Sequence, residues 1–283
     1  MSNPLGTLYI VATPIGHLAD ITQRALSILN SVSVIAAEDT RHSSYLLKHY
    51  QIKTPLIAYH EHNESTRSPE LVERLLKGDS IALISDAGTP LISDPGYRLV
   101  QLACQAGIAI TPIPGPCALI AALSASGLAT QGFVFDGFLP SKSTARQQHL
   151  RELSSETRSL VFYEAPHRIL ATIQDMLEIF GIERYAVIAR ELTKTFETIH
   201  GDKLGNLQAW LKNDHNQQRG EFVVIVAGAI PKDKADNSAE IERVLDLLLA
   251  ELPLKQAASL AAKLLNMPKN LLYKLALAKS QGV

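Results

Sequence analysis

The sequence predicts an α/β protein: two α/β domains followed by a small all-α domain. Three observations lead to this fold class. Strand-like and helical segments alternate through the first half, strand-like segments dominate the second half, and the end of the chain has only helical patterns. The predicted domains span residues 1–115, 116–229 and 239–283, with a linker at 230–238.

Short apolar runs followed by helical patterns make up the first predicted domain. The runs "TLYIVATP", "VSVIAAED" and "SIALISD" are typical of buried strands, and each precedes a helical segment. This alternation favours a mostly parallel sheet with helices on both faces. Asp20 is expected to cap one helix, and the pair Ser68 and Pro69 is expected to open another, because Asp and Ser cap helices and Pro fits their first turn.

The second predicted domain begins near a Pro-Gly-Pro break at Pro114–Pro116. The segment "ALIAALSASGL" follows as an apolar helix of small residues. Only "HRILATIQDMLEIFG" and "DKLGNLQAWLKN" then show clear helical patterns. Between and around them lie five strand-like segments: "QGFVFDGFLP", "RSLVFYEAP", "YAVIARELT", "TFETIHG" and "EFVVIVAG". This composition predicts a mixed sheet.

Three short helices are predicted after the polar stretch "IPKDKADNSAE". The first repeats apolar residues along one helical face: Ile241, Val244, Leu245, Leu248 and Leu249. The segments "LKQAASLAAKLL" and "KNLLYKLALA" follow, with a tight turn at "NMP" between them. This arrangement resembles a helix-turn-helix unit.

Composition narrows the class of protein. The chain has 283 residues, of which 46% are hydrophobic, as expected for a globular protein. No apolar run approaches the roughly 20 residues of a membrane helix, and the N-terminus lacks the basic region of a signal peptide. Cys104 and Cys117 have neither disulfide-framework nor zinc-site spacing. We therefore expect a cytoplasmic protein with no membrane contact and no metal.

Charge is distributed unevenly along the chain. No acidic residue follows Glu251, so the tail from Leu252 to Val283 carries +5 and the rest of the chain −6. A basic appendage on an acidic body predicts contact with a polyanion such as RNA. The alternative is a solvated lysine face on ordinary helices. The candidate RNA-binding residues are Lys255, Lys263, Lys269, Lys274 and Lys279.

Gly and Pro concentrate in the loops that follow the first domain's strands. The loop "SDAGTPLISDPG" holds two Ser-Asp-x-Gly repeats, at Ser85–Gly88 and Ser93–Gly96, and "ATPIGHLAD" and "PIPGPCAL" follow other strands. Ligands of open α/β sheets bind beyond the carboxyl ends of the strands, where free backbone N–H groups meet them. No loop has the G-x-G-x-x-G or P-loop pattern, which argues against a dinucleotide fold and a P-loop NTPase. The alternative is that these loops are only structural turns.

The segment "AEDTRHSS" places four polar side chains at the end of a predicted strand: Glu38, Asp39, Arg41 and His42. Carboxylates and a histidine beside a ligand loop are candidate acid–base groups. The alternative is helix capping by Asp39 or Thr40, with Glu38 near the positive end of the helix dipole.

The segment "YHEHNE" places two histidines, His60 and His62, on either side of a glutamate. A His-x-His pair can bind a metal when a third ligand is present. We favour a solvated loop, because the sequence has no H-E-x-x-H motif and no Cys and His residues at the spacing of a metal site.

Two further polar runs, "FYEAPHR" and "ARELTKTFE", follow apolar strands of the second domain. They contain seven charged or hydrogen-bonding side chains that cannot all be buried without partners: Glu164, His167, Arg168, Arg190, Glu191, Lys194 and Glu197. These side chains either pair with one another or line a cleft that faces the first domain. We favour the cleft, because both runs lie at strand ends.

Together these stretches resemble one family. The segments "LYIVATPIGHLADIT", "AAEDTRHS", "LISDAGTPLISDPG", "PIPGPCALIAALSASGL", "FLP", "VFYEAPHRI" and "RELTKTFE" are similar to those of the tetrapyrrole-methylase superfamily, and within it to the branch that acts on ribosomal RNA. The resemblance covers nearly the whole chain. It implies two α/β domains with S-adenosylmethionine in the cleft between them, a homodimer, and 2′-O-methylation of a cytidine in small-subunit (16S) ribosomal RNA.

The resemblance also implies which residues contact the methyl donor. They are Pro14, Asp86, Ala87, Gly88, Thr89, Pro90, Cys117, Ala118, Tyr163, Ala189, Arg190, Glu191 and Leu192. The family commonly has Ser where this chain has Cys117. A thiol is a weaker hydrogen-bond donor than a hydroxyl, so the backbone is the more plausible contact at that position.

Methyl transfer to a ribose 2′-OH needs a group that accepts the hydroxyl proton. We hypothesise that Asp39 or Glu164 is this base and that Arg190 or Lys194 holds an RNA phosphate. The RNA partner is either naked ribosomal RNA or the assembled small subunit. Two alternatives stay open: a methylase of a small tetrapyrrole-like molecule, which would need no basic tail, and a non-catalytic ribosome-assembly factor.

Overall fold

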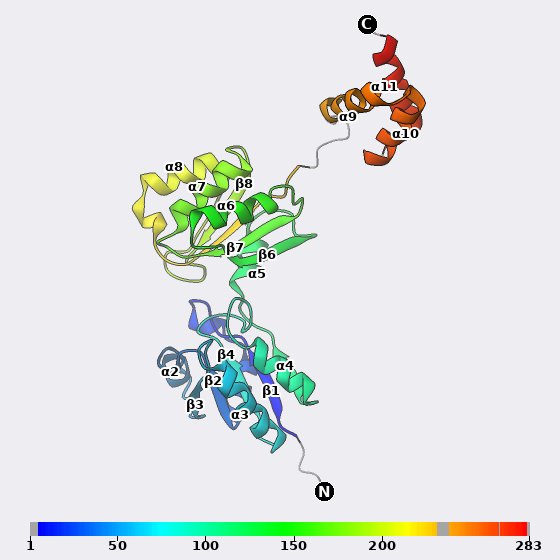
Figure 1. Cartoon of the computed structure of the whole chain (residues 1–283). Helices are drawn as coiled ribbons and strands as arrows, with labels where there is room; N and C mark the ends of the chain where they lie inside the picture. The colour runs from blue at the N-terminus through cyan, green and yellow to red at the C-terminus, as the bar shows by residue number, and fades with distance from the viewer. Residues whose placement is uncertain (1–4, 231–237, 266, 282–283) are drawn as a thin grey trace. The chain divides into compact units, whose positions relative to one another are not determined.

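The computed structural model describes residues 5–230, 238–265 and 267–281. The chain forms two compact units, Met1–Ala229 and Ile230–Val283. The first unit contains two five-stranded sheets, one built from β1–β5 and the other from β6–β10 (Figure 1). The described residues of the second unit form helices α9–α11.

The first sheet consists of parallel strands in the order β3-β2-β4-β1-β5. The strands span Thr7–Val11 (β1), Val34–Ala37 (β2), Leu56–Ala58 (β3), Ile81–Ile84 (β4) and Ala109–Ile113 (β5). Its helices span Gln23–Ser31 (α1), Thr40–His49 (α2), Glu64–Leu76 (α3) and Tyr97–Gln105 (α4).

The central strand β4 shows why the apolar runs of this half are continuous. Ala82 and Ile84 pack among side chains of α1 and α2, whereas Ile81 and Leu83 pack among side chains of α3 and α4. All four residues are buried, as expected for a strand covered on both faces. The predicted parallel sheet with helices on both faces is confirmed.

Two predicted helix starts are wrong. Asp20 does not cap α1, because it belongs to a short 3-10 turn, Leu18–Asp20, and the cap is Thr22, whose side chain accepts from the Ala25 N–H at 3.1 Å. Helix α3 begins at Glu64, so Ser68 and Pro69 lie inside it.

Burial explains the earlier start of α3. Ser68 is fully buried, where its hydroxyl donates to the Glu64 carbonyl at 2.6 Å and lies 2.9 Å from the Tyr59 hydroxyl. Pro69 costs the helix one backbone hydrogen bond in its second turn. Tertiary packing of this turn thus outweighs the local preference of a Ser-Pro pair for a helix start.

The second sheet is mixed, as predicted. Its strands have the order β6-β7-β10-β8-β9; β6 and β7 are parallel and the other neighbours are antiparallel. They span Phe133–Phe138 (β6), Ser159–Glu164 (β7), Tyr185–Arg190 (β8), Thr198–Lys203 (β9) and Phe222–Val226 (β10).

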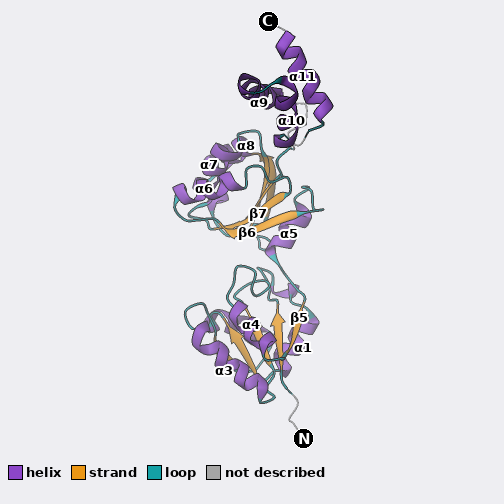
Figure 2. Ribbon diagram, turned by 45° about the vertical axis from the view of Figure 1, so that its right-hand side comes forward, coloured by secondary structure: helices purple, strands orange, loops and turns teal. Residues whose placement is uncertain are grey.

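Helices cover both faces of the second sheet. The helix α5 (Ala118–Ala125) packs on one face, and α6 (Ser143–Glu152), α7 (Ile169–Phe180) and α8 (Leu204–Asn213) pack on the other (Figure 2). A short 3-10 turn, His215–Gln218, precedes β10. Because β9 begins at Thr198, the preceding residues of the predicted strand "TFETIHG" belong to a loop.

The helix α6 is absent from the sequence prediction. Its inward face carries Arg146, which is only 3% exposed and is paired with Asp175 of α7 at 2.6 Å. The Arg146 guanidinium also donates to the Pro140 and Ser141 carbonyls at 3.2 and 3.1 Å. A buried ion pair therefore occupies part of the stripe that apolar residues usually fill, and apolar periodicity alone does not detect such a helix.

The second unit is a small helical domain. Its helices span Ser238–Glu251 (α9), Leu254–Leu264 (α10) and Lys269–Gln281 (α11). They enclose an apolar core: Ile241, Leu245, Ala258, Ala261, Leu272 and Ala276. The predicted linker at 230–238 falls largely on residues 231–237, which lie outside the described residues, and the predicted domain boundaries stay predictions. None of the helices in the described ranges has the length and hydropathy of a membrane span.

Candidate active site

The loops at the carboxyl end of the first sheet are joined by hydrogen bonds. The backbones of Thr13 and Gly88 exchange two bonds, of 2.8 and 3.0 Å, between the loops after β1 and β4. The Thr89 hydroxyl donates to the Pro116 carbonyl at 2.9 Å and so attaches the loop after β5. Gly88 has φ +82°, and a Cβ there would lie 3.3 Å from Ile15. Glycine therefore suits both the backbone conformation and the close packing of these loops.

A loop of the second sheet contacts the loop after β1. The Thr193 hydroxyl accepts from the His17 backbone N–H at 3.1 Å. A Cβ on Gly16 would lie 2.5 Å from Lys194 and 2.7 Å from the Thr193 hydroxyl. Thr193 and Glu191 both have positive φ, an uncommon backbone conformation that is found preferentially at functional sites.

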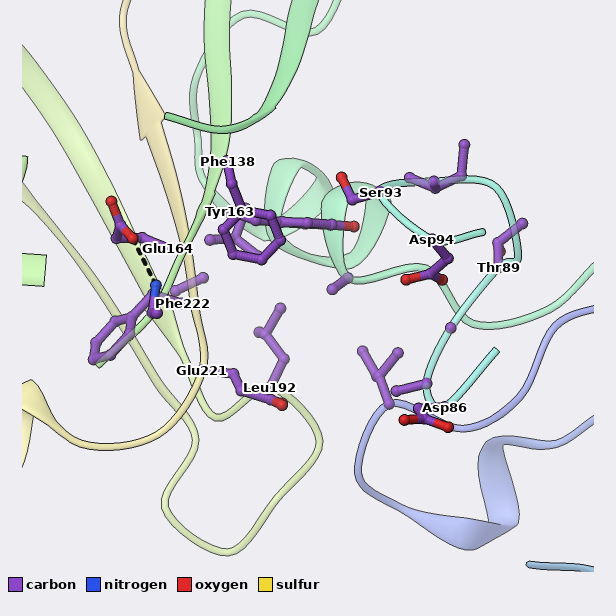
Figure 3. Close-up of a pocket in the computed structure, with 18 of the residues that line it drawn as sticks. Asp86, Thr89, Ser93, Asp94, Phe138, Tyr163, Glu164, Leu192, Glu221 and Phe222 are labelled. Carbon is purple, nitrogen blue, oxygen red and sulfur yellow. Dashed lines mark hydrogen bonds between the residues drawn. The ribbon is translucent and has the colours of Figure 1, made fainter. Parts of the chain in front are cut away.

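A pocket of about 440 Å³ lies among these loops (Figure 3). Residues that follow β1, β2 and β4 form one wall, and residues of β6, β7, β8 and β10 form the other. Its size falls in the range of small-molecule sites, roughly 300–1,000 Å³.

Carboxylates dominate the polar lining of the pocket. Glu38, Asp86 and Asp94 line the wall of the first sheet, and Glu164 and Glu221 line the other. Within the described residues that line the pocket there is no Lys, Arg or His. The pocket is therefore suited to a ligand with positive charge and unsuited to a phosphate.

Glu38, Asp86 and Asp94 lie close enough to affect one another. The Asp39 N–H donates to the Asp86 carboxylate at 2.9 Å, and the Asp86 N–H lies 3.5 Å from the Glu38 carboxylate. Burial, with the charge of Asp86, raises the pKa of Glu38. Burial also raises the pKa of Asp94 to about 6; the Ser85 side chain opposes this shift and the charges of Glu38 and Asp86 add to it. Glu38 and Asp94 are thus the pocket carboxylates with a raised pKa, which favours proton acceptance near neutral pH.

Aromatic rings form part of the opposite wall. Phe135 and Phe138 both meet Tyr163 edge to face, with ring centroids 4.9 and 5.8 Å apart. The Tyr163 hydroxyl accepts from the Leu119 backbone N–H at 3.1 Å. Burial raises the pKa of Tyr163 further above neutral pH.

The structure brings most of the predicted donor contacts to this pocket. Eight of them line it: Asp86, Ala87, Gly88, Thr89, Ala118, Tyr163, Ala189 and Leu192. Five others lie outside its lining: Pro14, Pro90, Cys117, Arg190 and Glu191. Cys117 is the N-cap residue of α5, and its side chain forms no capping hydrogen bond. The donor-binding roles of all thirteen stay predictions.

Asp39, one of the two predicted bases, caps α2. Its carboxylate accepts from the Arg41 backbone N–H at 2.8 Å and pairs with the Arg41 guanidinium at 2.9 Å. These contacts lower the pKa of Asp39 to about 2, so it accepts a proton poorly at neutral pH. This geometry agrees with the capping role that the sequence left open.

Glu164, the other predicted base, lines the pocket but is only 2% exposed. Its carboxylate accepts from the Ala165 N–H at 2.7 Å and the Thr172 hydroxyl at 2.5 Å, and it pairs with Arg168 at 3.1 Å. Figure 3 shows it across the pocket from Asp94.

The two predicted phosphate-binding residues do not line the pocket. Arg190 is 7% exposed, and its guanidinium donates to the Arg219 and Phe196 carbonyls at 3.0 and 3.1 Å. Lys194 pairs with Glu191 at 2.9 Å and with Glu221 at 2.8 Å. Both therefore bind other parts of this chain.

The sequence prediction of the site omitted Asp94, Phe138 and Glu221, which line the pocket. Asp94 had a detectable signal, because it belongs to the second Ser-Asp-x-Gly repeat. Phe138 belongs to the quoted "FLP" segment, but its orientation depends on the pairing of β6 with β7. The rings of His60 and His62 lie 5.9 Å apart, and the described residues contain no group of three or more side chains arranged for a metal.

Solved structures of other proteins share this fold. The structure is similar to that of the methyltransferase CobJ, with a TM-score of 0.59 and 18% identity over 79% of this chain and 95% of that one. It is also similar to diphthine synthase, with a TM-score of 0.59 and 16% identity over 78% and 90%. At this level of identity the likeness concerns the fold alone.

Sequence comparison identifies the family. Residues 7–208 match the Tetrapyrrole (Corrin/Porphyrin) Methylases, and residues 235–280 match the RsmI C-terminal HTH domain. The chain belongs to the tetrapyrrole methylase family. It is 56% identical to a Ribosomal RNA small subunit methyltransferase I of Pseudomonas aeruginosa, over 97% of this chain and 98% of the relative. Its identity to the protein of that name from Escherichia coli O157:H7 is 54%, over 99% and 97%.

Proposed function

We propose that this protein transfers a methyl group from S-adenosylmethionine to the ribose 2′-OH of a cytidine in small-subunit (16S) ribosomal RNA. The observation that carries the proposal is the identity of 54–56% to relatives named Ribosomal RNA small subunit methyltransferase I. That identity extends over 97–99% of this chain, including the helical second unit that a small-molecule methylase would not need.

The pocket supports S-adenosylmethionine as the methyl donor. Its sulfonium and ammonium groups are positive, which suits a pocket lined by carboxylates. The loop Asp86–Pro90 would hold it through backbone groups, because Gly88 has no side chain to prevent a close approach. Ala118, Ala189 and Leu192 would supply apolar contacts. When bound, the sulfonium supplies an activated methyl group, and the protein supplies position and a proton acceptor.

We assign the role of base to Asp94. It lines the pocket, is partly buried, and has a pKa of about 6, so at neutral pH it is ionised and still basic enough to take a hydroxyl proton. Asp39 and Glu164 are less suited. Asp39 is paired with Arg41, and Glu164 is bonded to Thr172 and Arg168.

RNA phosphates would be held outside the pocket by the second unit. Lys255, Lys263, Lys269 and Lys274 are exposed there, whereas Lys279 pairs with Asp246 at 2.5 Å. Lys194 and Arg190 would then stabilise the loops around the pocket. We expect a cytoplasmic homodimer that acts on ribosomal RNA, either naked or in the assembled subunit.

The test uses purified protein and S-adenosylmethionine labelled in its methyl group. The substrates are small subunits that lack ribose methylation, naked 16S RNA and a tetrapyrrole precursor. Label in the RNA of either ribosomal substrate supports the proposal and identifies the substrate form. Label in the tetrapyrrole alone would indicate a small-molecule methylase, and donor binding without any transfer would indicate an assembly factor.

A further inference from the structure

Strand β6 contains a bulge beside the pocket. Phe135 lies opposite Val161 and Phe138 lies opposite Tyr163, so β6 has one residue more than β7 between these pairs. An extra residue turns every side chain beyond it to the other face of the sheet. Without it, Gly137 would lie opposite Tyr163, and Phe138 would face the side covered by α6 and α7.

The bulge is held in place from several sides. Asp136 is bonded to His149 of α6, and the Leu139 carbonyl accepts from the Arg168 guanidinium at 2.5 Å. Gly137 has φ +63°, a left-handed conformation that glycine adopts without strain. The orientation of the neighbouring Phe138 is thus built into the fold.

The bulge places Phe138 on the pocket face, beside Tyr163 (Figure 3). Phe138 lines the pocket and yet is 54% exposed. The other phenylalanines of β6, Phe133 and Phe135, are partly buried and pack against the core cluster that contains α5. An exposed ring contributes little to folding, because it removes little apolar surface from water. Its position at a pocket instead fits contact with a flat, partly apolar ligand.

The charge of the pocket limits which part of an RNA can enter. Of its five carboxylates, Glu164 pairs with Arg168 and Glu221 with Lys194. Glu38, Asp86 and Asp94, on the other wall, repel phosphates but accept an uncharged base and ribose. Unpaired nucleobases stack on aromatic side chains, and carboxylates accept hydrogen bonds from the amino group of cytosine. Asp94, on the facing wall, would then meet the sugar or the base of a nucleotide that enters.

We propose that Phe138 stacks against the base of the target cytidine, which enters the pocket as an unpaired nucleotide turned out of the RNA. This inference rests on the proposed function, and it makes Phe138 a contact for the RNA and not for the methyl donor. Sequence-specific RNA-binding proteins commonly recognise unpaired bases that are turned out of the stack and stacked on aromatic side chains.

The test compares Phe138→Ala and Phe138→Trp with the unmodified protein, on small subunits that lack ribose methylation. Phe138→Ala removes the stacking contact with the base and should lower kcat/KM for the RNA roughly 5- to 100-fold. The Kd of S-adenosylhomocysteine, measured by calorimetry, should change less than about twofold. Phe138→Trp should retain most of the activity, because tryptophan also stacks. The control is Tyr45→Ala, which removes an exposed ring on α2, outside the pocket lining.

A second readout follows from the single tryptophan of the chain, Trp210 on α8. In Phe138→Trp, the added fluorescence should be quenched by the ribosomal substrate and not by S-adenosylhomocysteine alone. Quenching by S-adenosylhomocysteine alone, or an equal weakening of its binding in Phe138→Ala, would show that the donor's adenine occupies this position and would overturn the inference.

Unchanged kcat/KM in Phe138→Ala would also overturn the inference while leaving the proposed function intact. Failure of the unmodified protein to methylate any RNA would contradict the proposed function itself. The two failures are therefore distinguishable in the same set of assays.

Discussion

The Tyr163 hydroxyl accepts a hydrogen bond of 3.1 Å from the backbone N–H of Leu119, so a strand of the second sheet caps the first turn of α5. The N-cap residue of that helix, Cys117, forms no side-chain cap. First-turn N–H groups have no partner within a helix, and Tyr163 supplies one from outside. Tyr163, which lines the pocket, is thereby hydrogen-bonded to α5, the helix that covers one face of the second sheet.

Replacing Cys117 by Ser should stabilise the protein. A hydroxyl at the N-cap satisfies first-turn donors that the thiol leaves to others, and it should raise the free energy of unfolding by about 0.5–1 kcal/mol. Tyr163→Phe should lower it by about 1 kcal/mol. Urea unfolding measures both, with Cys104→Ser, an exposed position on α4, as the control. A lower free energy of unfolding in Cys117→Ser would show that packing of the thiol stabilises the protein more than a serine cap does.

Asp94→Asn should remove the proposed base without changing the shape of the pocket. We expect kcat to fall about 10²- to 10⁴-fold, which is the usual contribution of a general base. Since the pKa of Asp94 is about 6, kcat/KM of the unmodified enzyme should fall as the pH drops below about 6, and the variant should lack this dependence. Asp39→Asn and Glu164→Gln serve as comparisons. If one of them lost kcat by this factor and Asp94→Asn did not, the base would be Asp39 or Glu164 and not Asp94.

The same substitution should stabilise the folded protein at neutral pH. Burial raises the pKa of Asp94 from 3.8 to about 6, so folding opposes its ionisation. The resulting loss of stability is absent below about pH 4, where the group is protonated in both states, grows as the pH rises from about 4 to about 6, and is complete above about 6. Asp94→Asn should therefore gain about 1–2 kcal/mol at pH 7.5 and nothing at pH 4. Equal unfolding free energies at pH 7.5 would contradict the raised pKa.

Gly88→Ala should weaken donor binding, whereas Gly107→Ala should not. Both glycines have positive φ, so alanine costs each about 1 kcal/mol of stability. A Cβ at Gly88 also meets Ile15 at 3.3 Å beside the pocket, whereas a Cβ at Gly107 has nothing within 4 Å. We expect the Kd of S-adenosylhomocysteine to rise about tenfold in Gly88→Ala only, a cost of about 1.4 kcal/mol. An equal rise in both variants would assign the effect to general destabilisation.

The exposed lysines of the second unit should control the salt dependence of RNA binding. Each phosphate contact contributes about 0.7–0.9 to the slope of log K against log salt. Changing Lys255, Lys263, Lys269 and Lys274 to Gln in the full chain should lower that slope by about 3 and leave donor binding unchanged. The matched control changes four exposed lysines of the first unit: Lys48, Lys53, Lys142 and Lys212. An equal effect of the control set would indicate nonspecific attraction by charge.

Much of the fold could be predicted from local patterns. Apolar runs such as Ile81–Ile84 are continuous because both faces of the strand are buried. The pocket loop around Asp86 could be located because Gly, Pro and Asp gather at a strand end. Where patterns failed, long-range contacts explain the failure. Helix α6 depends on the buried pair of Arg146 and Asp175, which are distant in sequence.

The chemical roles were harder to predict than the location of the site. Asp39 and Asp94 both follow strands of the first sheet, and the sequence does not distinguish a capped carboxylate paired with Arg41 from a partly buried one with a raised pKa. Phe138 faces the pocket because of one extra residue in β6, and that bulge is defined only by pairing with β7. Burial and register, which arise from tertiary structure, decide these roles.

The most direct test of the account is the identity of the methylated nucleoside. Small subunits that lack ribose methylation are incubated with the protein and methyl-labelled S-adenosylmethionine, the RNA is digested to nucleosides, and the labelled product is identified by mass spectrometry. The account predicts label in 2′-O-methylcytidine with the unmodified protein and a large loss of it with Asp94→Asn. Label in a base-methylated nucleoside, or none in RNA, would contradict it.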